Sequence, residues 1–149
     1  MKILLVVVVL GLSTLFGPVV PLNAQEKKED ELLLFLMAAR NAAKAGWADK
    51  AIQRYDAYLK KNPEDKDARL EFADYLQDRG YYEKAGIHYD ILIQKIGGVQ
   101  EGTDGFTKKL MLNAARNAFK NKNEYRAVEY YKQTLSFDTD DSKIAQEIA

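Results

Sequence analysis

Few side chains in this sequence could carry out catalysis or bind a metal. His88 is the only histidine and cysteine is absent, which excludes the usual zinc and copper ligand sets and thiol chemistry. A serine–histidine–carboxylate site would need His88 to meet Ser136 or Ser142, and neither serine lies in a nucleophile-elbow motif. We therefore expect His88 to have a packing or surface role. We expect no enzymatic activity, no metal and no cofactor.

Two polar segments are better explained as loops than as sites. Glu64 and Asp65 follow Pro63 in KKNPED, where carboxylates solvate a turn and cap the next helix. Segment 95–109, KIGGVQEGTDGFTKK, is glycine-rich but lacks the Gly-Lys-Ser/Thr run and preceding strand of a phosphate-binding loop. It is predicted as a flexible loop between helices. A loop that contacts a partner is the alternative, because long loops in compact proteins are often functional.

The first 24 residues differ from the rest of the chain. Lys2 precedes the uncharged run ILLVVVVLGLSTLF, and Ala24 precedes the charged QEKKEDE. This order is typical of a secretory signal peptide cleaved after Ala24, and we predict a periplasmic or secreted protein with a short linker at 25–30. An uncleaved membrane anchor is the alternative, since the uncharged stretch 3–22 has about the length of a bilayer span.

The charges give no indication of a nucleic-acid partner. Lysine and arginine number 22, as do aspartate and glutamate. A neutral chain lacks the basic surface that binds nucleic acids or anionic membranes. A membrane is therefore expected as a partner only if the N-terminal segment is retained.

Three stretches of the sequence share one residue spacing. A shift of 34 residues places Gly46, Ala51 and Tyr55 on Gly80, Ala85 and Tyr89. A further shift of 42 residues leads to the third copy, and Ala39, Ala73 and Ala115 correspond in the same way, as do Ala51, Ala85 and Ala127, and Tyr55, Tyr89 and Tyr131. A repeat of this length is typical of helical solenoids, in which neighbouring units jointly bury a core.

Each copy is predicted to form two helices. Apolar residues recur at three- and four-residue steps, which predicts first helices at about 31–45, 66–79 and 107–121 and second helices at about 48–61, 82–96 and 124–137. Gly46 and Gly80 fit a left-handed residue that closes a first helix, and Pro63 ends a second helix. In the third copy Lys122 takes the glycine position between Asn121 and Asn123, asparagine being the next best residue for that conformation.

The sequence resembles the tetratricopeptide repeat family. The 34-residue period, the small residue at the eighth repeat position, the alanine at the twentieth, the tyrosine at the twenty-fourth and Pro63 at the thirty-second carry the likeness. The family's tryptophan is missing, and Gly86 interrupts the second helix of copy two. The resemblance implies an all-α, right-handed solenoid over 31–139, with repeats at about 32–65, 66–99 and 108–139. Residues 140–149 are expected as a partial fourth repeat or a short capping helix.

The resemblance also implies a peptide-binding groove lined by the first helices. The positions that face a ligand in this family correspond here to Leu36, Arg40, Lys44, Leu70, Asp74, Asp78, Leu112, Arg116, Phe119 and Lys120. The same correspondence adds Leu33, Ala43, Asp67, Gln77 and Lys109. A mixed-charge groove over leucines suits an amphipathic helix or an extended peptide. The alternative is that Arg40 and Arg116 pair with Asp74 and its neighbours and stabilise the stack.

These observations predict a non-catalytic, exported scaffold that binds a protein or peptide in the cell envelope. A second hypothesis is that the chain is the N-terminal repeat region of a larger exported protein, such as an envelope polysaccharide-secretion or outer-membrane assembly component. A homodimer through the C-terminal end is a further open alternative, because uncovered solenoid ends often stack.

Overall fold

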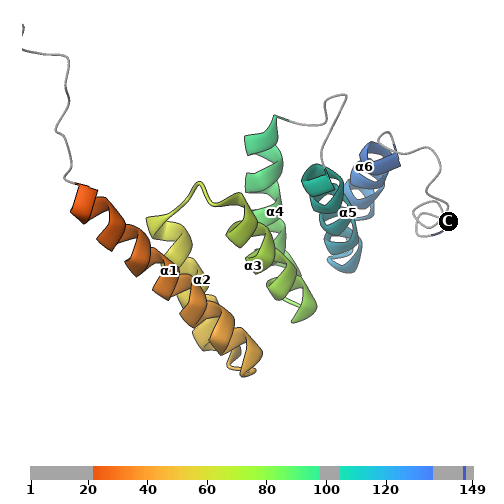
Figure 1. Cartoon of the computed structure of the whole chain (residues 1–149). Helices are drawn as coiled ribbons and strands as arrows, with labels where there is room; N and C mark the ends of the chain where they lie inside the picture. Colours follow the sequence, from red (N-terminus) through yellow and green to blue (C-terminus); the bar gives the residue numbers. More distant parts are fainter. Residues whose placement is uncertain (1–21, 98–104, 136–145, 147–149) are drawn as a thin grey trace, which may run out of the picture.

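The described residues form six α-helices and no strand. The computed structural model describes residues 22–97, 105–135 and 146. The helices are α1 (Leu22–Lys44), α2 (Ala48–Lys61), α3 (Lys66–Asp78), α4 (Tyr82–Ile96), α5 (Gly105–Lys120) and α6 (Glu124–Leu135). Each of α1, α3 and α5 packs against the helix that follows it, and the resulting pairs follow one another across the molecule (Figure 1). This arrangement confirms the predicted all-α stack of helix pairs.

The predicted helix bounds hold best in the middle of the chain. The bounds of α2 and α4 are those predicted, whereas α1 begins at Leu22 rather than at residue 31. The residues predicted as a linker are therefore helical. The glycine-rich segment at 98–104 lies outside the described residues, as do residues 1–21 and, except for Gln146, the C-terminal segment 140–149. In the part of the chain that is described, no helix is long and apolar enough to cross a bilayer.

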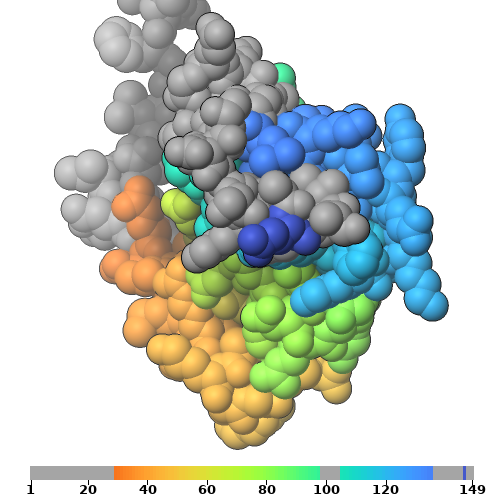
Figure 2. Space-filling model, turned by 90° about the vertical axis from the view of Figure 1, so that its right-hand side faces the viewer, coloured from red at the N-terminus to blue at the C-terminus, as the bar shows by residue number. Residues whose placement is uncertain are grey.

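The repeated alanines and tyrosines form the core between the helices. The alanines at the two repeated positions are each at most 2% exposed, and Tyr55, Tyr89 and Tyr131 at most 4%. Small side chains allow two helix axes to approach closely, and the tyrosine rings fill the space between neighbouring pairs. Figure 2 shows side chains of α3 and α4, in green, lying between those of α1 and α2 and those of α5 and α6. The residues that repeat in the sequence are therefore the ones that form the jointly buried core.

The ends of the first helices share one backbone geometry. Gly46, Gly80 and Lys122 have φ angles of 75°, 80° and 61°. At each of them the next N–H donates to a carbonyl five residues back, as from Asn123 N to Ala118 O at 2.9 Å. This left-handed closure is the one predicted for the two glycines. In the third copy Lys122 itself adopts it, so the expectation that a flanking asparagine would do so is wrong.

The turn between α2 and α3 is also built as predicted. Helix α2 ends at Lys61, two residues before Pro63. Asp65 caps α3, because its Oδ1 accepts a hydrogen bond from the Ala68 N–H at 2.9 Å. Glu64 pairs with Lys95 of α4 at 2.7 Å. The two carboxylates therefore have structural roles.

Candidate functional site

A groove of about 880 Å³ lies on the side of the molecule formed by α1, α3 and α5. We call it the α1–α3–α5 groove. It is lined by Arg40, Ala43, Lys44, Tyr55, Asp67, Leu70, Glu71, Asp74, Tyr75, Asp78, Gly105, Phe106 and Lys109. Its volume is within the range of pockets that bind small ligands.

Helix α3 supplies the central wall of the groove. Asp67, Glu71, Asp74 and Asp78 follow one another at steps of four, three and four residues, which places the carboxylates on one face of the helix. Between them Leu70 is buried and contributes apolar surface, as do the partly buried Tyr75 and Phe106. The groove thus combines a row of carboxylates with an apolar floor.

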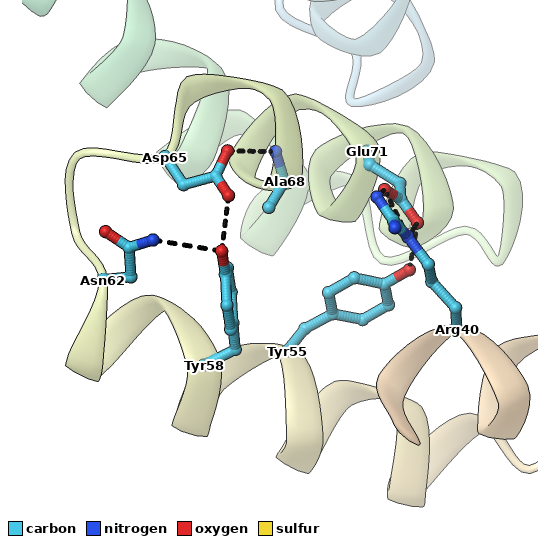
Figure 3. A network of polar contacts seen from close by, with 7 residues as sticks. All are labelled: Arg40, Tyr55, Tyr58, Asn62, Asp65, Ala68 and Glu71. Carbon is cyan, nitrogen blue, oxygen red and sulfur yellow. Dashed lines mark hydrogen bonds and ion pairs between the residues drawn. The ribbon is translucent and has the colours of Figure 1, made fainter. Parts of the chain in front are cut away.

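Arg40 of α1 is held by Glu71 of α3 (Figure 3). Its Nη2 lies 2.6 Å and its Nε 2.9 Å from carboxylate oxygens of Glu71, and the Tyr55 hydroxyl donates to Glu71 Oε1 at 2.7 Å. Burial alone would raise the pKa of Glu71, but the hydrogen bonds from Arg40 and Tyr55 outweigh it and lower that pKa. Arg40 therefore joins two helix pairs. This pairing is the one predicted as the alternative, in which Arg40 pairs with Asp74 or its neighbours and stabilises the stack.

Asp74 is likewise engaged by its neighbours. Its Oδ1 accepts hydrogen bonds from the Tyr89 hydroxyl and from Asn113 Nδ2, each at 2.8 Å, and Lys109 Nζ lies 3.3 Å from its Oδ2. Burial, together with the charge of Asp74, raises the pKa of Tyr89. Like Glu71, Asp74 therefore links consecutive helix pairs.

The remaining charged side chains of the groove have no side-chain partner among the described residues, and we call them uncommitted. Lys44, Asp67 and Asp78 are exposed, and within the described ranges none of them has an ion-pair or hydrogen-bond partner through its side chain. Asp67 lies in the first turn of α3 and Asp78 is its last residue, so they stand at opposite ends of the groove. These are the charges that the groove presents to a ligand.

The structure brings half of the predicted site residues into the groove. Arg40, Lys44, Leu70, Asp74 and Asp78 line it, together with Ala43, Asp67 and Lys109 from the wider set. Leu36, Leu112, Arg116, Phe119 and Lys120 are absent from the lining, as are Leu33 and Gln77. Leu36 and Gln77 are buried, Leu112 packs against the core, and Lys120 lies over the Tyr82 ring. Phe119 is 61% exposed, outside the groove.

Sequence reasoning missed Tyr55, Glu71, Tyr75, Gly105 and Phe106 as groove residues. Glu71 lies four residues after Asp67 and three before Asp74, so the helical period could have identified it. The sequence predicts that this helix begins at about residue 107, which leaves Phe106 in the preceding loop. In the structure α5 begins at Gly105. No sequence pattern distinguished Phe106 from the residues of the preceding loop.

Among the described residues, the polar side chains in and near the groove do not gather into a metal site. Across residues 22–97 and 105–135, no three histidine or carboxylate side chains gather in a way that could hold a metal ion. His88 lies apart from the groove, with its Nδ1 3.4 Å from Arg69 Nη1 and its ring against Phe72 at 4.7 Å between centroids. The predicted packing role of His88 is confirmed.

Comparison with known proteins supports the helical-repeat fold. No protein-family model matches the sequence, and no curated protein does. A solved structure with a similar fold is the N-terminal domain of stress-induced protein-1 (STI-1) from C. elegans, with a TM-score of 0.64 and 15% sequence identity. The match covers 81% of this chain and 94% of that domain. This likeness supports the helical-repeat fold of the chain.

Proposed function

We propose that this protein is a non-catalytic scaffold that binds a protein or peptide in the α1–α3–α5 groove. The observation that carries the proposal is the groove itself, because it joins an apolar floor to charged groups that no other described residue engages. Grooves of this composition bind peptides through apolar contacts and gain specificity from the charges at their edges. The helical-repeat fold, shared with the STI-1 domain, supports such a role.

The N-terminal sequence supports an exported location for this scaffold. The segment 1–24 has a basic start, an apolar run and a small residue before a charged stretch, and cleavage after Ala24 would leave α1 beginning at Gln25. N-terminal sequencing of the chain from the cell-envelope fraction should find Gln25 as the first residue. A full-length chain recovered from the cytosol would contradict export, and a full-length chain in the membrane fraction would show that the segment is an anchor.

Site-specific photo-cross-linking in the native host tests the groove. A photoreactive benzoyl-phenylalanine at Lys44, inside the groove, should form a covalent adduct with the partner, whose identity mass spectrometry would give. The control position is Lys60 of α2, an exposed lysine that does not line the groove. Adducts at position 44 and none at position 60 are expected. Equal adducts at both positions, or none at position 44, would contradict the proposal.

A further inference from the structure

The uncommitted charges indicate which class of peptide the groove accepts. Of the four carboxylates along α3, Glu71 is paired with Arg40 and Asp74 with Lys109. Asp67 and Asp78 have no cationic partner in the described part of the chain. Among the described lining residues there are thus two uncommitted carboxylates and one uncommitted cation, Lys44. A ligand therefore gains more from positive than from negative side chains, since a like charge beside a carboxylate is repelled.

The spacing of these two carboxylates sets the length of a segment that reaches both. Asp67 and Asp78 are eleven positions apart on α3, which is about 16 Å along the helix. An extended chain covers that distance in about five residues. A short extended segment along the α3 wall therefore reaches both carboxylates.

The floor of the groove indicates what lies between the two charges. Leu70 lies between Asp67 and Asp78 on α3, and Tyr75 and Phe106 add partly buried rings to the lining. Apolar side chains of a bound segment would be removed from water against these three residues, at about 25 cal/mol per Å² of apolar surface. The segment thus needs apolar residues between its two basic ones.

We infer that the α1–α3–α5 groove binds an extended peptide segment with two basic side chains about five residues apart and apolar residues between them. This inference rests on the proposed function, and Asp67 and Asp78 are the groups that select the charge. The ion pairs would be solvent-exposed, so each contributes a factor of about two to five in affinity. Added salt weakens them.

The probe is a dye-labelled peptide with blocked ends, Ala-Lys-Ala-Leu-Ala-Leu-Ala-Lys-Ala, in which an extended chain places both lysines and both leucines on one face; it is titrated by fluorescence anisotropy against the full chain. Two further peptides carry glutamate or glutamine in place of both lysines. The lysine peptide should bind about tenfold more tightly than the glutamate peptide, with the glutamine peptide between them. Raising the salt concentration should reduce the difference.

Paired variants locate the effect. Asp67→Asn/Asp78→Asn should weaken binding of the lysine peptide by about tenfold. The matched control is Asp49→Asn/Glu129→Gln, which removes a first-turn aspartate of α2 and an exposed glutamate of α6 and should leave affinity unchanged. Circular dichroism confirms that both variants fold. Equal affinity of the two variants would overturn the inference.

The remaining outcomes separate this inference from the proposed function. If the glutamate or glutamine peptide binds as tightly as the lysine peptide, the charge assignment is wrong, whereas the groove still binds peptides. If none of the peptides binds at about 1 mM, the inference is wrong, and the cross-links at position 44 decide the proposed function separately.

Discussion

At the scale of single residues, polar side chains hold consecutive helix pairs together. Arg40 and Tyr55 both reach Glu71, and Tyr89 and Asn113 both reach Asp74. Each carboxylate is thus shared between elements that are distant in sequence. Because Arg40 already has this structural role, reversing its charge would disturb the stack as well as the groove. Lys44, Asp67 and Asp78 give cleaner tests of binding.

Removing the Tyr55 hydroxyl tests this shared-carboxylate arrangement. Tyr55→Phe keeps the buried ring but removes the hydrogen bond to the charged Glu71, so we expect the free energy of unfolding to fall by about 1.5 kcal/mol. Urea denaturation measures the change. Tyr125, which is 83% exposed, provides the control, because Tyr125→Phe should have no measurable effect. A Tyr55→Phe variant as stable as the control would show that the hydrogen bond contributes nothing.

His88 should make the stability depend on pH. Burial and the nearby Arg69 lower the pKa of His88 from 6.5 to about 4. Between these pH values the unfolded chain binds a proton that the folded chain does not, so this stability is present above about pH 6.5 and is lost as the pH falls towards 4. In His88→Gln the free energy of unfolding should decline less between about pH 7 and pH 4.5. Identical declines in the two proteins would contradict this account.

At the scale of the elements, the ends of the first helices require a left-handed residue. Gly46 and Gly80 adopt this conformation without steric cost, and a Cβ at either position would meet nothing within 4 Å. Lys122 adopts it against the preference of residues that carry a Cβ. The repeat frame places Gly46, Gly80 and Lys122 at the same repeat position, and the sequence predicted the left-handed conformation correctly for the two glycines. In the third copy it favoured a flanking asparagine over Lys122, because the prediction followed residue preference, whereas the backbone hydrogen bonds that close the helix require the residue at the glycine position.

Exchanging these residue types tests the strain at the helix ends. Lys122→Gly should raise the free energy of unfolding by about 0.5–1 kcal/mol, because glycine removes the strain while adding some entropy to the unfolded chain. Gly80→Ala should lower it by about 1 kcal/mol. Thermal unfolding followed by circular dichroism measures both. A loss of stability in Lys122→Gly would mean that the lysine side chain contributes more than its backbone conformation costs.

At the scale of the whole molecule, the sequence predicted the stack and its core better than its groove. Alanines and tyrosines at fixed repeat positions predicted which faces are buried, because burial follows the helical period. The groove depends on the relative positions of α1, α3 and α5, which no local pattern records. Phe119, for example, was predicted in the groove from its repeat position and lies outside it.

The ion pairs within the groove also could not be predicted from the sequence. The sequence left open whether the charged residues of the first helices face a ligand or pair with one another within the stack. In the structure Arg40 and Lys109 pair with two of the carboxylates of α3. A long side chain such as Arg40 can reach several carboxylates. The packing of the helices decides that Arg40 pairs with Glu71 and not with Asp74. The uncommitted charges could be identified only after those pairs were known.

The central claim is that the α1–α3–α5 groove is the surface that binds an extended chain. Backbone amide chemical shifts, recorded while the lysine peptide is titrated into the isotope-labelled protein, test it most directly. We predict that the shifts change at residues 40–44, 67–78 and 105–109 and stay constant at Lys60, Ile87 and Glu129. Changes confined to α2, α4 and α6, with the groove residues unaffected, would contradict the claim.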